Sequence, residues 1–168
     1  MAISPYLRQL RGKVGHDLLL VPSVTGIVFD DADRILLVRH SQGGVWVAPG
    51  GAVDPDETPA DALVREVWEE TGLWVEPKRL LGVFGGPDFR VRYANRDEVA
   101  YVMSLFECEP VGGDLRANGE EITDVRFVGE QELGQLNIPA WARRVLPPVF
   151  VRDRPNRGFT PAAWRPPA

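Results

Sequence analysis

A segment near the middle of the chain predicts a helix whose two ends are both marked. Thr58 offers a hydroxyl for the N-cap, Pro59 suits the first helical position, and Asp61 lies three residues after the cap. Gly72 marks the end, because glycine readily adopts the left-handed conformation that follows a helix. The sequence therefore predicts a helix from about Pro59 to Thr71.

The two sides of this helix differ in character. The expected packing stripe is apolar at helical spacing and consists of Ala60, Leu63, Val64, Val67 and Thr71. On the other side, the spacing of Glu66, Glu69 and Glu70 places three carboxylates on one face. Like charges at such spacings cost roughly 0.2–0.5 kcal/mol per pair in an isolated helix. The cluster is therefore either a solvated surface or a site for a hard divalent cation such as Mg²⁺ or Mn²⁺.

The residues that flank the cluster favour the cation site. Gly50 and Gly51 allow the backbone to approach a ligand closely, and Glu57 lies just before the helix, where it can fold back onto the acidic face. Arg65 precedes Glu69 by four residues and can pair with it. A glycine pair, a preceding acid and an acidic helix occur together much less often than an acidic helix alone.

The rest of the chain alternates strand-like and helical segments, which is typical of an α+β or three-layer α/β/α fold. Strands are expected at residues 21–30, 34–39, 45–48, 79–84, 89–93, 98–108 and 123–128, and short helices at 130–136 and 139–146. The turn-prone residues Asp30 to Asp33 predict that the first two strands form a hairpin. The length suits one domain, from 18 to 150. Residues 1–17 read as an N-terminal arm with one short strand, and 151–168 as an extended or disordered tail rich in Pro and Arg.

Composition narrows the setting of the protein. Cys108 is the single cysteine, so an intrachain disulfide is impossible and a reducing, cytoplasmic location is expected. No apolar stretch has the length of a membrane span, and residues 1–12 lack the apolar core of a signal peptide. A net charge of −5 disfavours DNA as a partner. An anionic substrate would then need a metal ion to neutralise its approach.

The segment from Gly51 to Leu73, GAVDPDETPADALVREVWEETGL, resembles the Nudix signature G-x5-E-x7-R-E-U-x-E-E-x-G-U, in which U is a bulky aliphatic residue. The matched positions are Gly51, Glu57, Arg65, Glu66, Val67, Glu69, Glu70, Gly72 and Leu73. Trp46 to Gly50 also resembles the lead-in WxxPGG of this family. The resemblance extends from Val21 to about Leu146.

The resemblance implies an α/β/α sandwich around a mixed sheet, with a loop-helix-loop motif that binds one to three divalent ions. By the family pattern, the metal ligands are Glu66, Glu69 and Glu70, with the Gly50 carbonyl as an additional candidate. Arg65 and Glu57 would hold these carboxylates in place. For Arg65 the alternative is a plain ion pair on the helix.

The implied reaction is hydrolysis of a diphosphate, in which charge neutralisation and an activated water overcome the repulsion of a nucleophile by the phosphate oxygens. The family often takes its general base from a glutamate on a later loop. Glu120 and Glu121, before the last expected strand, are placed for this role. Glu121 is the favoured base, with Glu66 as the competitor inside the motif.

Substrate selection is less constrained by the sequence. The segment from Tyr93 to Val102 partly resembles a Pro-Asn-Gly-Asp stretch of one Nudix subgroup, from which Ala94 and Arg96 depart. Candidates near it, for stacking on a base or pairing with phosphate, are Phe84, Phe89, Arg90 and Arg92, and Glu120 is a further weak substrate-binding candidate. Alternation of core and solvent positions along a strand explains these residues equally well. Trp46 and His40 receive no role.

The expected substrate is a nucleoside diphosphate linked to another moiety, such as ADP-ribose or another nucleotide sugar. The alternative is a (d)NTP pyrophosphohydrolase that removes damaged nucleotides. RNA ends are disfavoured, because the only basic run is in the tail, at Arg152, Arg154, Arg157 and Arg165. A non-catalytic nucleotide-binding regulator usually lacks one of the glutamates that this chain retains, and an isoprenoid diphosphate isomerase needs a catalytic cysteine, for which Cys108 is poorly suited. The resemblance also leaves a homodimer open.

Overall fold

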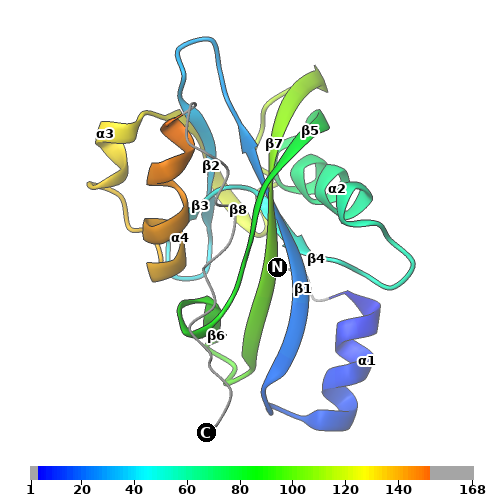
Figure 1. Ribbon diagram of the computed structural model, residues 1–168. Helices are drawn as coiled ribbons and strands as arrows, with labels where there is room; N and C mark the ends of the chain where they lie inside the picture. The colour runs from blue at the N-terminus through cyan, green and yellow to red at the C-terminus, as the bar shows by residue number, and fades with distance from the viewer. Residues whose placement is uncertain (1–3, 152–168) are drawn as a thin grey trace, which may run out of the picture.

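The computed structural model describes residues 4–151 and arranges them as two β-sheets flanked by helices (Figure 1). The larger sheet has the order β4–β1–β7–β5, with β6 also paired to β7. Its strands are β1 (Leu19–Val28), β4 (Gly50–Ala52), β5 (Leu73–Phe84), β6 (Arg90–Arg92) and β7 (Glu98–Gly113). It is mixed, because β1 and β7 are parallel and the other pairs are antiparallel.

The smaller sheet is antiparallel and has the order β3–β2–β8. It consists of β2 (Ile35–His40), β3 (Trp46–Val47) and β8 (Ile122–Val128). The helices are α1 (Pro5–Val14), α2 (Pro59–Thr71), α3 (Glu130–Leu133) and α4 (Ala140–Val145), with short 3₁₀ turns η1 (Pro87–Phe89) and η2 (Pro147–Phe150). The expected α+β class, with sheets between helices, is confirmed.

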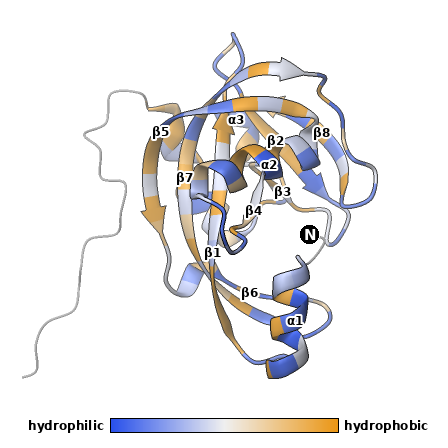
Figure 2. Ribbon diagram, turned by 90° about the vertical axis from the view of Figure 1, so that its right-hand side faces the viewer, coloured by the Kyte–Doolittle hydropathy of each residue, from blue (hydrophilic) through white to orange (hydrophobic). Residues whose placement is uncertain are grey.

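Two apolar clusters hold these layers together. On one face of the larger sheet, Leu63 and Val67 of α2 pack with Val24 of β1 and Val75 of β5. On the other face, a cluster that includes Ile27 joins the two sheets to α3 and α4. Figure 2 shows hydrophobic residues along β1, β5 and β7, whereas α1 is largely hydrophilic. The larger sheet is therefore covered on both faces near its centre.

Helix α2 has the bounds that its capping residues predict. The Thr58 hydroxyl accepts a hydrogen bond from the Asp61 amide at 3.1 Å, and Gly72 adopts a left-handed conformation with φ 69°. The predicted packing stripe is partly wrong, because Ala60 is exposed while Glu66 and Glu70 are buried. The helix packs against both the centre of the sheet and β4, so its buried face includes Glu66 and Glu70.

The predicted hairpin between the first two strands forms only at its turn, where the Asp30 amide donates to the Arg34 carbonyl oxygen at 3.0 Å. A single bridge, Phe29 to Ile35, joins them before they enter different sheets. β1 is buried on both faces from Ser23 to Val28, and Ile35 to Val38 of β2 are all fully buried. Such strands need neighbours and cover on both sides, so β1 lies between β4 and β7, and β2 lies between β3 and β8.

The expected short strand in residues 1–17 is also wrong, because α1 forms there. The Ser4 hydroxyl accepts a hydrogen bond from the Leu7 amide at 3.2 Å, and Pro5 occupies the first turn. Leu7 packs against a small cluster that contains Val21 and Val99. Local capping, the Leu7 contact and a hydrogen bond from Arg11 to the Glu98 carbonyl oxygen explain a helix where composition indicated an arm.

The remaining differences concern bounds. Strands β5 and β7 are longer than expected, the segment 89–93 divides into η1 and β6, and α3 and α4 are shorter than predicted. The tail expected from 151 lies outside the described residues beyond Val151. Within residues 4–151, no helix has the length and apolar character needed to cross a membrane.

Candidate active site

Two glutamates of α2 lie buried against β4. Glu66 is 8% exposed and Glu70 is 3% exposed. The Gly50 amide donates a hydrogen bond to Glu70 Oε2 at 3.0 Å. A Cβ atom on Gly51 would lie 2.3 Å from the Glu66 carboxylate, and a Cβ on Gly50 would lie 2.2 Å from the Val24 carbonyl oxygen. Gly51 is therefore required by the close approach of β4 to Glu66, and Gly50 by the close approach of β4 to the backbone of β1.

Arg65 connects the acids of this region. Its Nε donates to Glu57 Oε1 at 2.7 Å and its Nη2 donates to Glu57 Oε2 at 2.8 Å. Nη1 donates to Glu66 Oε1 at 2.9 Å, and Nη2 also contacts the Ala52 carbonyl oxygen at 3.2 Å. These bonds raise the pKa of Arg65, so it remains charged and orients Glu57 and Glu66 together.

Glu69 behaves differently from its two neighbours. Its side chain is 55% exposed, and Oε2 lies 3.4 Å from Arg65 Nη1. Among residues 4–151, no three acidic, histidine or cysteine side chains converge on one point. The structure therefore brings Glu66 and Glu70 together inside the protein and leaves Glu69 at the rim.

The burial of Glu66 and Glu70 disfavours their ionised forms. Burial raises the pKa of Glu70 to about 8, and the charges of Glu66 and Glu121 add to the effect against the Gly50 hydrogen bond. Burial likewise raises the pKa of Glu66, although Arg65 opposes the shift. A hard divalent cation beside these carboxylates would favour their ionised forms. The oxygen donors and their charge thus fit a metal ion of this class.

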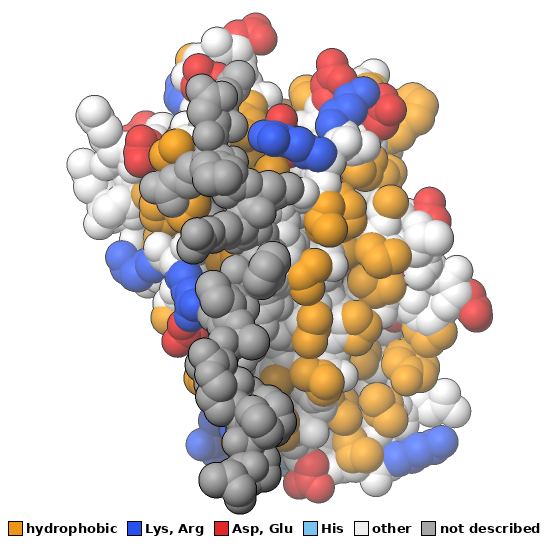
Figure 3. Space-filling model, viewed as in Figure 1, with side chains coloured by type: hydrophobic (Ala, Val, Ile, Leu, Met, Phe, Trp, Pro, Cys, Tyr) orange, Lys and Arg blue, Asp and Glu red, His pale blue; other side chains and the backbone are white. Residues whose placement is uncertain are grey.

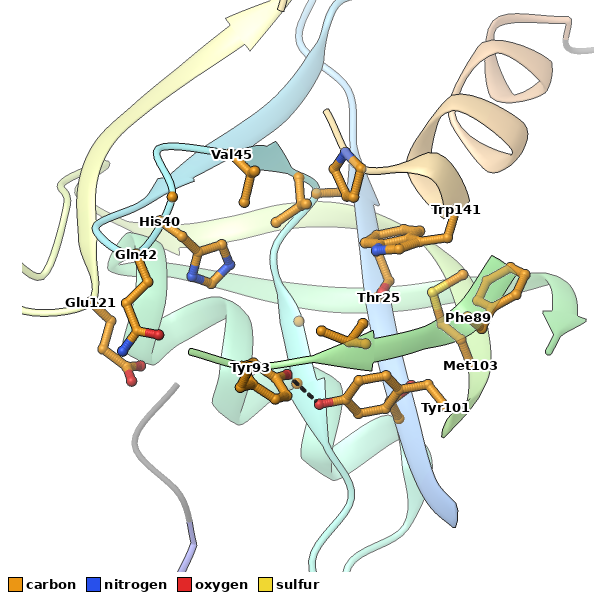
Figure 4. A pocket seen from close by; sticks show the side chains of 18 of the residues that line it. Thr25, His40, Gln42, Val45, Phe89, Tyr93, Tyr101, Met103, Glu121 and Trp141 are labelled. Carbon is orange, nitrogen blue, oxygen red and sulfur yellow. Dashed lines mark hydrogen bonds between the residues drawn. The ribbon is translucent and has the colours of Figure 1, made fainter. Parts of the chain in front are cut away.

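A cavity of about 460 Å³ borders the glycine pair (Figure 4). Its aromatic walls are Phe89, Tyr93, Tyr101 and Trp141. The hydroxyls of Tyr93 and Tyr101 are hydrogen-bonded at 2.6 Å. His40, Gln42 and Glu121 supply polar groups from the opposite side, and burial lowers the pKa of His40. The cavity is mostly apolar with a few polar groups, as small-molecule sites usually are.

The two candidate general bases on the loop before β8, Glu120 and Glu121, differ in position. Glu121 lines the cavity, whereas Glu120 is exposed and does not. Asn118 Oδ1 accepts hydrogen bonds from the amides of Glu120, Glu121 and Ile122. Asn118 Nδ2 donates to the Glu69 carbonyl oxygen at 3.3 Å, which ties this loop to α2. Nothing in the sequence around Asn118 indicated this role, which depends on α2 and the loop meeting in space.

The substrate-binding candidates divide in the same way. Phe84 stacks on Phe89 at a centroid distance of 6.3 Å and does not line the cavity. Arg90 forms an ion pair with Glu98 at 2.5 Å and also lies outside the lining. Arg92 lines the cavity with a side chain that is 69% exposed. The placement therefore disfavours Phe84, Arg90 and Glu120 as substrate-binding residues, and it is consistent with that role for Phe89 and Arg92.

Three residues without an assigned role are now placed. Trp141, which the sequence analysis missed, lines the cavity from the start of α4, because the packing of α4 on the sheets sets its direction. Trp46 is buried in the core, with Arg126 5.0 Å from its ring centroid. Cys108 is buried in the cluster under α2, away from the cavity lining. This position is consistent with a structural thiol and not with a nucleophile.

Comparison with known proteins agrees with this geometry. The model of the NUDIX domain matches residues 19–149. A MutT-like protein of Streptomyces ambofaciens is 37% identical over 145 residues, which cover 83% of this chain and 87% of that protein. An ADP-ribose pyrophosphatase of Methanocaldococcus jannaschii is 36% identical over 127 residues, or 72% of this chain and 70% of that protein. The crystal structure of a MutT protein from Methanosarcina mazei superposes with a TM-score of 0.64 at 26% identity, covering 82% of this chain and 96% of that one.

Proposed function

Because the chain belongs to the Nudix hydrolase family, we propose that it hydrolyses the diphosphate of a nucleoside diphosphate linked to a second moiety, such as ADP-ribose or another nucleotide sugar. One observation carries the proposal. The aromatic cavity opens onto Gly50 and Gly51, beside the buried carboxylates of Glu66 and Glu70. A nucleotide whose nucleobase lies in the cavity would therefore have its phosphates next to the acidic helix.

The proposed cofactor is Mg²⁺ or Mn²⁺. Glu66, Glu69, Glu70 and the Gly50 carbonyl would hold it, since oxygen donors suit both ions. Such an ion would supply positive charge to neutralise phosphate oxygens and would favour ionisation of a water. Arg65 and Glu57 have a positioning role, because their hydrogen bonds fix the Glu66 carboxylate.

The other steps belong to side chains around the cavity. Glu121 lines the wall on the polar side, where its carboxylate can accept a proton from the attacking water. Glu66 is the competing base, although its bond to Arg65 already occupies one carboxylate oxygen. Phe89 and Trp141, whose ring centroids lie 6.3 Å apart, offer apolar surfaces for the nucleobase of the substrate. Arg92, at the rim, is placed to approach a phosphate.

The alternative substrate class is a (d)NTP, which could occupy the same cavity. The similarity to a MutT-like protein supports this alternative. One experiment separates the two. The purified chain is incubated with Mg²⁺ or Mn²⁺ and with ADP-ribose, other nucleotide sugars and nucleoside triphosphates, and the products are resolved by mass. We expect AMP and ribose 5-phosphate from ADP-ribose, and no reaction in chelator. Release of inorganic pyrophosphate from triphosphates, without cleavage of ADP-ribose, would overturn the proposal. A folded protein that binds nucleotides without cleaving any would instead indicate a regulator.

We also propose self-association and, since the single cysteine suits a reducing compartment, a cytoplasmic location. Figure 3 shows hydrophobic side chains gathered over strands of the larger sheet. Exposed apolar side chains on these strands include Leu20, Leu80, Val83 and Val102. Such a surface suits a second copy of the chain. Light scattering that shows only an 18.7 kDa species at micromolar concentration would exclude the dimer.

A further inference from the structure

A second chamber of about 550 Å³ adjoins the first. The two chambers share Gln42, Gly43, Tyr93, Ala94 and Tyr101 as lining residues. Each has a volume that is typical of a site for a small molecule. The two chambers are therefore adjoining compartments that meet at these shared residues.

The strand β1 shows how the compartments are arranged. Leu19 and Val21 line the second chamber, and Ser23 and Thr25 line the first. Alternate residues of a strand point to the same face, so these four side chains form one floor. At about 3.3 Å per residue, this floor is about 20 Å long. Leu20, between the first two, points to the other face and is 73% exposed.

The proposed metal site lies beside one compartment only. Ala52, Gly51 and Gly50 of β4 pair with Ser23, Val24 and Thr25 of β1. From this edge the first chamber extends across β1 and β7 to Phe89 and Trp141. The second chamber extends along the same two strands to α1. Two groups attached to a diphosphate at β4 could therefore occupy separate compartments.

The lining of the second chamber suits an uncharged group. Five of its residues have aliphatic side chains: Leu7, Leu19, Val21, Ala94 and Val99. Arg11 is the one cation among the described residues of this lining, and its guanidinium already donates to the carbonyl oxygens of Gly15, Asp17 and Glu98. Asp97 is paired with His16 at 2.7 Å. No cation of this lining is thus left to compensate a further phosphate.

The junction between the compartments carries hydroxyl groups. Tyr93 and Tyr101 line both chambers, and the hydrogen bond between them uses one of their two hydroxyl protons. The other proton remains available to a ligand oxygen that passes between the compartments. A sugar or a second nucleoside has oxygens suited to this contact.

We propose that the second chamber, closed by α1, binds the group attached to the β-phosphate, so that the enzyme prefers nucleoside diphosphates with a second uncharged substituent to nucleoside triphosphates. The inference rests on the proposed function and specifies its substrate class. α1 then contributes directly to specificity. The residues that would set it are Leu7, Leu19 and the tyrosine pair.

The test fills the second chamber without changing the first. Leu19→Trp adds bulk to the floor, and Leu7→Trp adds bulk from α1, so the two variants probe different walls. Leu18→Trp and Gln9→Trp are matched controls, because these exposed positions do not line either chamber. Circular dichroism establishes that each full-length variant is folded. The measured quantities are the KM for ADP-ribose and the inhibition constant of ADP, which lacks the second substituent.

We expect both chamber variants to raise the KM for ADP-ribose by about tenfold and to leave the inhibition constant of ADP within about twofold, with both controls unchanged. If the chamber variants match their controls, or weaken ADP as much as ADP-ribose, the inference is wrong although the hydrolysis stands. A wild-type enzyme that cleaves triphosphates and not ADP-ribose would overturn the inference and the proposed function together.

Discussion

The guanidinium of Arg65 binds the Glu57 carboxylate through two hydrogen bonds, of 2.7 Å and 2.8 Å. The same guanidinium donates to Glu66, which lies against Gly51. Glu57, on the loop before α2, thus orients Arg65, and Arg65 in turn orients Glu66 on the same helix. The direction of the Glu66 carboxylate depends on this chain of contacts.

Replacement of Arg65 by lysine should lower kcat/KM by about 10- to 100-fold, because lysine keeps the charge and loses the planar fork that holds Glu57 and Glu66 together. Steady-state kinetics in saturating Mg²⁺ would measure the effect, and thermal unfolding would show that the fold persists. Arg34→Lys is the matched control, because Arg34 pairs with Asp30 at the surface. Equal activity of the two variants would contradict the positioning role.

Glu70→Gln should lower turnover by more than about 100-fold, since loss of a metal ligand should exceed the loss of a residue that only supports a ligand. At pH 7 the melting temperature without metal should change little, because a pKa of about 8 leaves the Glu70 carboxyl largely protonated. Glu69→Gln should also lower turnover by more than about 100-fold, although the Glu69 side chain is exposed. The ligand assignment is wrong if either variant retains near-full activity with metal present. Glu76→Gln, at an exposed pair with Lys78, is the control.

Glu121→Gln should reduce kcat by about 10²- to 10⁴-fold, the usual contribution of a general base, because the amide cannot accept the proton. Glu120→Gln should leave kcat nearly unchanged, because its side chain lies outside the cavity lining. The two variants alter neighbouring residues of one loop, so each serves as the control for the other when kcat is compared. A larger loss in the Glu120 variant would refute the assignment, and full activity of both would favour Glu66 as the base.

The thiol of Cys108 should be unreactive in the native protein at pH 8. Burial, with a contribution from Glu107, raises its pKa to about 12 from an ordinary value near 9. Because the folded pKa is the higher one, the stability that the neutral thiol contributes is complete below pH 9 and is lost as the pH rises towards 12. A colorimetric disulfide reagent should label the cysteine only after denaturation. Rapid labelling of the native chain would show that the thiol is accessible.

Helix α2 could be predicted to the residue because its limits are local. The Thr58 cap and the Gly72 conformation involve contacts with residues three or four positions away, so the sequence contains all the required information. The same holds for the resemblance, whose matched residues lie in one continuous segment. The family comparison then confirmed what this segment implied about fold and reaction class.

The sequence by itself thus determined the helix, the identity of its acids and the class of hydrolase. Only the tertiary structure decided that Glu66 and Glu70 are buried and Glu69 exposed, because burial depends on where β4 lies against α2. It also decided that β1 and β2 enter different sheets and that α1 closes a second chamber. These outcomes depend on contacts between distant segments, which periodicity and capping along the chain do not encode.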